Sequence, residues 1–505
     1  MHPEDDPVSY HAAKRIEAFR GLRLRSPLHP SETRLLSILG VQVCLLPWAL
    51  GTMHRWSQAI SLGIAIAGIV AALWPRSYSR DLTGDEDPYR LFMGRRLIHF
   101  PIFWIGAALL AYVVLQATNP AWRYTQSATQ WWLVRMDHIP WLPCGIDAPF
   151  TQSNEWRQVI VYTAAWLSVC SVWVGLTRRR SLRILLGIIV GNALLLVGLL
   201  AIQQFTGNHR IPWPLTAWTD YPLTASFIYH NHAGAYLALA TFCAIALAVW
   251  FFDHGSRSFA KSTPASVLAL AALLLVGFVF FTLSRGAILT LAVSTAILAG
   301  WFLLRWRVLP GIPGANPVIR MAIVAMFIVF VAVVFRYLDF SEIWGRWDMI
   351  ATQGSREVSV HSRVLVRDAA IDMLKTQGLR GVGAGGFRYL FPEYVQNYPE
   401  IYEGGTLYWE HAHCDWLEFP IELGLAGDLL ILGGAGWWIA FFVRRRAFWN
   451  ALAVPLLLGC LQTVIHAGFD FPFQCPAILV TWCMIVAIAG RWIELEPSAT
   501  ERTEG

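Results

Sequence analysis

The chain has 505 residues, of which 56% are hydrophobic and 14% are charged, and its formal net charge is +6. Soluble domains carry about 25% charged residues, so this composition excludes a disordered chain and argues against a soluble enzyme. The apolar surplus predicts a polytopic membrane protein if it is gathered into stretches of about 20 residues.

Twelve stretches of the sequence are apolar and long enough to span a membrane. In chain order they lie at 35–54, 57–75, 97–117, 157–176, 184–205, 232–252, 264–283, 286–304, 318–336, 417–442, 448–467 and 474–490. The stretch at 417–442 begins with an amphipathic turn, so we expect its membrane part to start near Gly424. The pattern predicts an all-α polytopic membrane protein with about twelve transmembrane helices.

Lys and Arg in the connecting segments orient these helices. With the N-terminus in the cytoplasm, 25 of the 39 basic residues fall on the cytoplasmic side. Seven of the other 14 lie in the long segment 337–413, where the rule is weak because long loops translocate regardless of charge. An odd number of spans would place the arginines at 178–180 or at 444–446 on the wrong side. Both termini are therefore predicted to be cytoplasmic.

The spans divide the chain into five predicted regions. These are a cytoplasmic segment at 1–34, a membrane region of about nine helices at 35–336, an outer loop at 337–413, the last three membrane helices at 414–491 and a cytoplasmic tail at 492–505.

The outer loop is predicted to be partly helical. Residues 361–377 alternate an apolar and a polar side with helical spacing, and Arg367 lies on the polar side. A glycine-rich turn follows at 378–386. Its formal GxGxxG has no preceding strand and faces away from the cytoplasmic nucleotides, so we interpret it as a tight turn.

Tryptophan is abundant near the ends of the spans, which is typical of an aromatic belt at the lipid headgroups. Trp131 and Trp132 lie in a second outer segment, at about 118–156. For these two residues, stacking against a sugar is the alternative to the belt.

Three residues at the outer ends of spans could handle an anion or a proton: Arg285, Arg363 and His413. An arginine between two apolar runs is expensive unless it reaches headgroups, a polar cavity or an anion. Snorkelling to the interface is the alternative for Arg285. Histidine titrates near neutral pH, so His413 could act as a general base.

Further polar residues on the same face could support these three. They are Asn231, His232, Arg367, His411, Asp415, His466 and Asp470. A cap or a loop hydrogen bond is the alternative role for most of them. His411, His413 and Asp415 could also suggest a metal site, but ligands at i and i+2 converge only in an extended segment, so we predict no metal.

Five pieces of the sequence resemble the O-antigen ligase and O-antigen polymerase family of bacterial membrane glycosyltransferases. They are TyrHisAsnHisAlaGlyAlaTyrLeu (229–237), LeuSerArgGlyAlaIleLeu (283–289), SerArg (362–363) with the later GlyLeuArgGlyValGlyAlaGlyGlyPhe (378–387), the stretch from His413 to Gly427, and HisAlaGlyPheAspPhePro (466–472). Together they cover about 225–475 in the family's order. Cys414 departs from the family pattern, which usually has Asn after the histidine.

The resemblance implies an enzyme of the bacterial inner membrane that builds lipopolysaccharide or a related polysaccharide and works at the periplasmic face. Its donor would be a glycan on undecaprenyl pyrophosphate, and its acceptor lipid A–core, another glycan or a protein. We expect that no metal, nucleotide cofactor or nucleic acid takes part. By motif, Arg285 and Arg363 resemble pyrophosphate-binding arginines, His413 resembles the base, and the outer loop becomes periplasmic.

The residues themselves agree with that chemistry. Arginine suits a pyrophosphate because its planar guanidinium makes bidentate bonds and stays charged. A lipid or polysaccharide transporter is the alternative from another class, because twelve spans with both ends inside are also common in transporters. Against it, the sequence shows no repeat between its halves and no acidic residue clearly in the middle of a span.

Overall fold

A computed structural model of the chain describes residues 28–78, 89–91, 93–209, 223–257, 263–308, 358–402 and 408–496. The apolar stretch predicted at 318–336 lies outside these residues, as do the ends of the chain and residues 337–357 of the outer loop. Each of the other predicted stretches overlaps a helix.

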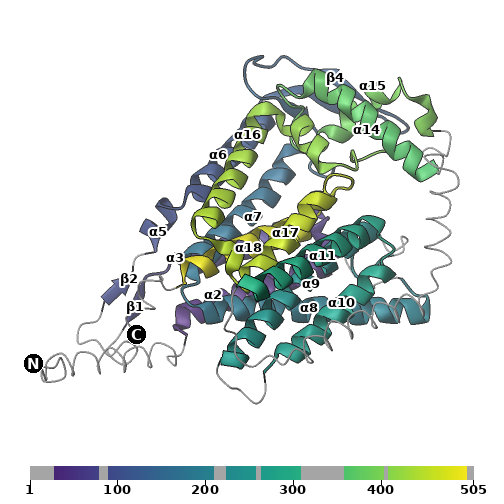
Figure 1. Cartoon of the computed structure of the whole chain (residues 1–505). Helices are drawn as coiled ribbons and strands as arrows, with labels where there is room; N and C mark the ends of the chain where they lie inside the picture. Colours follow the sequence, from purple (N-terminus) through teal and green to yellow (C-terminus); the bar gives the residue numbers. More distant parts are fainter. Residues whose placement is uncertain are drawn as a thin grey trace, which may run out of the picture.

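Eight helices within the described ranges are long and apolar enough to cross a membrane. They are α3 (Arg55–Leu73), α6 (Pro101–Thr118), α7 (Glu155–Gly175), α8 (Arg179–Thr206), α9 (His230–Arg257), α11 (Arg285–Val308), α16 (Asp415–Arg444) and α18 (Pro476–Glu494). Three further apolar helices join the bundle in Figure 1: α2 (Pro30–Trp48), α10 (Ala265–Phe281) and α17 (Ala453–His466). The protein is a mostly helical, multi-pass membrane protein.

Small side chains let the central helices approach one another closely. Helix α9 packs against α8, α10 and α17, and its alanines from Ala233 to Ala246 are buried. On α17, Gly459 lies directly against the ring of Phe242 on α9, so that any larger side chain there would collide with it. In lipid, where apolar burial gives little drive for association, such close packing holds helices together.

The prediction of an all-α protein is wrong for the segment at about 118–156. This segment folds into a three-stranded sheet of order β4–β3–β5, made of β3 (Pro120–Gln126), β4 (Trp131–Arg135) and β5 (Gly145–Asp147). Strand β3 pairs antiparallel with β4 and parallel with β5. The reason is period-two alternation. Trp122, Tyr124, Trp131 and Leu133 pack on one side into a core, while Arg123, Trp132 and Val134 between them are exposed.

That core lies at one end of the helix bundle, where the sheet is covered by α14 (Val358–Gln377) and α15 (Phe387–Val395) (Figure 1). Helix α14 coincides with the amphipathic helix predicted at 361–377. The remaining elements are short. They are α5 (Gly94–Ile98), the hairpin β1 (Arg76–Tyr78) with β2 (Tyr89–Leu91), and single 3-10 turns at Leu50–Thr52, Pro399–Tyr402, Ala447–Trp449 and Pro472–Gln474.

Candidate functional site

Segments that are far apart in the sequence meet at the end of the bundle that faces α14. Helices α9, α11, α16 and α18 begin at this end and α17 finishes there. We call it the site end. Its helix termini bring together polar side chains from the middle, the outer loop and the last part of the chain.

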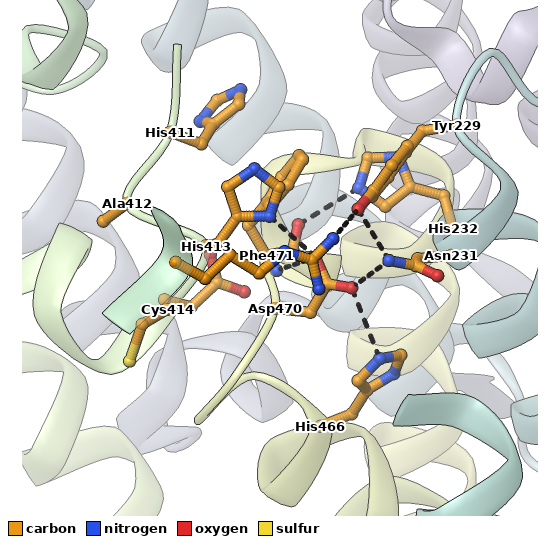
Figure 2. A network of polar contacts seen from close by, with 12 residues as sticks. Tyr229, Asn231, His232, His411, Ala412, His413, Cys414, His466, Asp470 and Phe471 are labelled. Atoms are coloured by element: carbon orange, nitrogen blue, oxygen red, sulfur yellow. Dashed lines mark hydrogen bonds and ion pairs between the residues drawn. The ribbon is translucent and has the colours of Figure 1, made fainter. Parts of the chain in front are cut away.

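Asp470, in the turn between α17 and α18, is the buried centre of a polar network (Figure 2). Asn231 at the start of α9 donates a hydrogen bond from Nδ2 to Asp470 Oδ2. Two imidazoles face the same carboxylate, with His413 Nδ1 at 3.7 Å from Oδ1 and His466 Nε2 at 3.6 Å from Oδ2. The carboxylate therefore joins three of the predicted site residues around itself.

Tyr229 connects Arg363 to this network. Its hydroxyl accepts a hydrogen bond from Asn231 Nδ2 at 2.6 Å and another from Arg363 Nη2 at 3.3 Å. Its ring stacks on Phe471, with 5.2 Å between the ring centroids. Tyr229 and Phe471 are not among the predicted site residues. Their position is the signal that could have found them, since Tyr229 lies two residues before Asn231 and Phe471 directly follows Asp470.

His413 is held in an unusual backbone conformation beside aromatic rings. Its φ is +50°, in the left-handed region that is uncommon for residues other than glycine. Its imidazole stands edge-on to Phe471 and Trp409, with centroids 4.7 and 5.2 Å away. Backbone strain of this kind clusters at functional sites, where the surroundings over-determine it.

The electrostatics of the network favour a neutral His413 beside an ionised carboxylate. Burial lowers the pKa of His413 below its ordinary value, and Asp470 only partly opposes that effect. For Asp470, burial raises the pKa, but the two facing imidazoles outweigh it and the pKa lies well below its usual range. Burial raises the pKa of Tyr229, so its hydroxyl keeps its proton. A neutral imidazole next to a fixed anion is the arrangement that a general base needs.

Arg285 begins α11 close to this network. Its neighbour Gly286 lies directly against the imidazole of His466, and a β-carbon at position 286 would collide with that ring. Arg285 itself is only partly buried. The structure therefore brings the start of α11 to the network, as it does Arg363 and His413.

The side chains of four other predicted supporting residues do not hydrogen-bond to the Asp470 carboxylate. His411 Nδ1 lies 2.6 Å from Glu418 Oε1, Asp415 accepts a hydrogen bond from the backbone N–H of Phe473 at 2.9 Å, and His232 Nε2 lies 3.2 Å from the carbonyl oxygen of Phe471. Arg367 is exposed on α14. Burial lowers the pKa of His411, but the Glu418 carboxylate outweighs this effect, so the pKa is raised.

The metal alternative for His411, His413 and Asp415 finds no geometric support, because these side chains face different partners. Across the described ranges, no three His, Cys, Asp or Glu residues form a group that could hold a metal ion.

Two glycines join the outer loop to α16. Gly424 interrupts α16 with φ +66°, at the residue where we expected the membrane part of this stretch to begin. A β-carbon on Gly424 would lie 2.6 Å from the backbone of Arg380 and Gly381. Next to this contact, the N–H groups of Val382 and Gly383 donate to carbonyl oxygens of α16 at 3.0 Å. The turn after α14 is thereby fixed to the helix that follows His413.

The fold and the site define a multi-pass membrane protein that gathers arginine, histidine and carboxylate side chains at one end of its bundle. Residues 269–432 match the family model for O-antigen ligases. The chain thus contains, over these residues, the O-antigen ligase domain of a family of membrane glycosyltransferases, which confirms the resemblance predicted from its motifs. A comparison with curated proteins gave no match.

The matched residues include Arg285, Arg363 and His413, while Tyr229, Asn231, His466 and Asp470 lie outside them. The structure therefore extends the candidate site beyond the family match, on both sides of it in the sequence.

Proposed function

We propose that this enzyme transfers a glycan from undecaprenyl pyrophosphate to an acceptor hydroxyl at the periplasmic face of the bacterial inner membrane. The observation that carries the proposal is the meeting of Arg363 and His413 around Tyr229, Asn231 and Asp470. Members of the matched family transfer lipid-linked glycans. The donor lipid, the acceptor and the roles of the residues below are our inferences.

In this mechanism Arg285 and Arg363 hold the diphosphate and stabilise the negative charge that it gains on leaving. The Nδ1 atom of His413 faces Asp470, which leaves Nε2 to take the proton of the acceptor hydroxyl. The acceptor oxygen forms a bond to the anomeric carbon while the bond from that carbon to the pyrophosphate oxygen breaks. Attack in line with the leaving group inverts the anomeric centre. Asp470 stabilises the imidazolium that results.

We propose the topology that the basic residues indicate, with about twelve spans and both termini in the cytoplasm. The regions are then 1–34, 35–336, 337–413, 414–491 and 492–505, and the site end is periplasmic. In support, the arginines at 178–180 and 444–446 lie where α8 begins and α16 ends, at the end of the bundle opposite the network. This distribution follows the positive-inside rule.

The acceptor belongs to one of three classes: lipid A–core, a second lipid-linked glycan as in a polymerase, or a protein hydroxyl.

A transporter is the alternative from another class of protein. The position of the polar network favours the transferase, because it lies at the ends of helices whereas transporters bind substrates near the membrane midplane.

The test uses the purified full chain with an undecaprenyl-pyrophosphate glycan and a panel of the three acceptor classes. We expect His413→Ala to reduce transfer by about 10²- to 10⁴-fold, the usual contribution of a general base. Arg363→Ala should weaken use of the donor much more than it lowers the melting temperature. Undiminished transfer by His413→Ala would contradict the assigned base, and movement of the glycan lipid across liposomes without any transfer would favour a transporter.

A further inference from the structure

We propose that an aromatic corner beside His413 binds a saccharide. The corner consists of Trp131, Arg388, Tyr408 and Glu410. This inference deepens the proposed function and rests on it, because the saccharide would belong to the donor or to the acceptor of the same reaction.

Three segments build the corner. Trp131 lies on β4, Arg388 on α15, and Tyr408 and Glu410 on the segment that leads to His413. The rings of Trp131 and Tyr408 meet edge to face, with 6.1 Å between their centroids. The Tyr408 hydroxyl donates to the carbonyl oxygen of Arg388 at 2.6 Å, and Arg388 Nη2 pairs with Glu410 Oε1 at 3.0 Å. The corner is therefore held in shape before any ligand arrives.

The corner is also open to solvent. Tyr408 is 43% exposed, and the side chains of Glu410 and Arg388 are 53% and 20% exposed. Large rings that are fixed yet partly exposed lose little conformational entropy on binding, which makes them effective contact surfaces.

The chemistry of the corner matches a sugar. A pyranose ring has apolar faces of C–H groups and an edge of hydroxyl groups. Aromatic rings cover apolar faces, while the guanidinium donates hydrogen bonds and the carboxylate accepts them. Because Glu410 neutralises Arg388, the corner has no excess positive charge for a phosphate. It differs in this respect from the region of Arg285 and Arg363.

The corner lies within reach of the proposed reaction centre. Trp409, between Tyr408 and Glu410 in the sequence, contacts the His413 ring with 5.2 Å between centroids. Glu410 precedes His413 by three residues, which even a fully extended chain spans in about 11 Å. A glycan that reacts at His413 could therefore extend onto the corner.

The structure distinguishes two tryptophans that the sequence left equivalent. Trp131 contacts Tyr124, Tyr389 and Tyr408. Trp132, the next residue on β4, points to the opposite face of the sheet and is 46% exposed. Trp132 is therefore a matched control for Trp131.

The experiment compares Trp131→Ala with Trp132→Ala in the purified full chain, varying donor and acceptor separately. We expect Trp131→Ala to raise the KM of one substrate about three- to tenfold, as the loss of one aromatic contact implies, with kcat nearly unchanged. The substrate whose KM rises carries the bound sugar, so a donor effect and an acceptor effect identify the two possible sources. Equal KM values for the two variants, with both substrates, would overturn the proposal that the corner binds a saccharide.

A binding measurement separates this proposal from the proposed function. The glycan released from the donor lipid and the free acceptor oligosaccharide are titrated into wild type, Trp131→Ala and Trp132→Ala, with saturation-transfer NMR as the readout. Weaker binding in Trp131→Ala alone supports the corner even if no transfer is detected, and equal binding in all three proteins overturns it. If Trp131→Ala does not fold, Glu410→Gln on the exposed rim replaces it, with weaker saccharide binding expected and unchanged binding contradicting the proposal.

Discussion

The two ends of the helix bundle differ in how the partners of a buried carboxylate are placed. At the end opposite the site, Glu32 of α2 accepts hydrogen bonds from the backbone N–H groups of Thr177 and Arg178 at 3.0 and 3.1 Å and from Ser181 Oγ at 2.7 Å. Its other oxygen pairs with Arg76. At the site end, both imidazoles stand 3.6–3.7 Å from Asp470, and neither facing nitrogen has a hydrogen-bond partner among the described residues.

This difference distinguishes a structural cluster from the proposed site. A buried carboxylate whose oxygens are saturated fixes the helices around it and has no capacity for further chemistry. A carboxylate with imidazoles just beyond hydrogen-bond distance can tighten its contacts when a proton or a substrate arrives, because catalytic hydrogen bonds are often long before substrate binds. The comparison predicts large stability effects at one end and large activity effects at the other.

The largest effect is expected for Glu32→Ala. Removing this carboxylate leaves Arg76 buried without its counter-charge, which costs about 3–5 kcal/mol when a buried pair is broken. Thermal unfolding in detergent should show a clearly lowered melting temperature, while the surviving folded protein keeps its KM for the donor. A melting temperature equal to that of wild type would contradict the structural role of Glu32.

The next largest effect is expected for Asp470→Asn. The amide keeps the size of the side chain but no longer stabilises an imidazolium, so we expect kcat to fall about ten- to a hundredfold, equivalent to roughly 1.4–2.7 kcal/mol. The melting temperature should fall less than in Glu32→Ala, because the amide oxygen can still accept the hydrogen bond from the backbone N–H of Phe471. Asp147→Asn, at an exposed carboxylate of the sheet, is the control. A large loss of stability with unchanged kcat would make Asp470 a structural residue.

The sequence predicted most of the helices because a run of about 20 apolar residues is a strong signal. It also singled out Asn231, His466 and Asp470, which the structure brings into contact, because polar residues at the ends of apolar runs are conspicuous. The sheet was missed because its strands have only three to seven residues, and the parallel pairing of β3 with β5 depends on contacts that no local pattern encodes.

The supporting residues show where local spacing fails. His411, His413 and Asp415 are alternate residues, yet their side chains face three different partners. The left-handed backbone at His413 breaks the alternation that an extended segment would have. Tyr229 and Phe471 were missed for another reason, since aromatic residues at span ends are usually explained by the headgroup belt.

A smaller effect is expected on the pH dependence of kcat/KM. The neutral form of His413 is the active one, and burial lowers its pKa, so activity should persist at pH 6.5 and fall only at lower pH. Asp470 raises this pKa and Arg363 lowers it. Asp470→Asn should therefore move the acid limb of the pH profile to lower pH, and Arg363→Gln should move it to higher pH. If the acid limb moved in the same direction in both variants, its assignment to the titration of His413 would be contradicted.

The smallest effect is expected for Arg367→Ala, which tests how far the site end extends along α14. Arg363 and Arg367 are one helical turn apart, but Arg363 reaches Tyr229 while Arg367 is exposed. Arg367 acts on the site only through its field, which lowers the pKa of Cys414 although burial raises it more. At physiological salt such a field is screened over about 8 Å. We expect the donor KM to change less than about twofold in 0.15 M salt, and somewhat more in dilute buffer. Arg367→Ala could instead impair donor use as strongly as Arg363→Ala at both salt concentrations. Both arginines would then have to contact the diphosphate directly, and the proposed site would include Arg367.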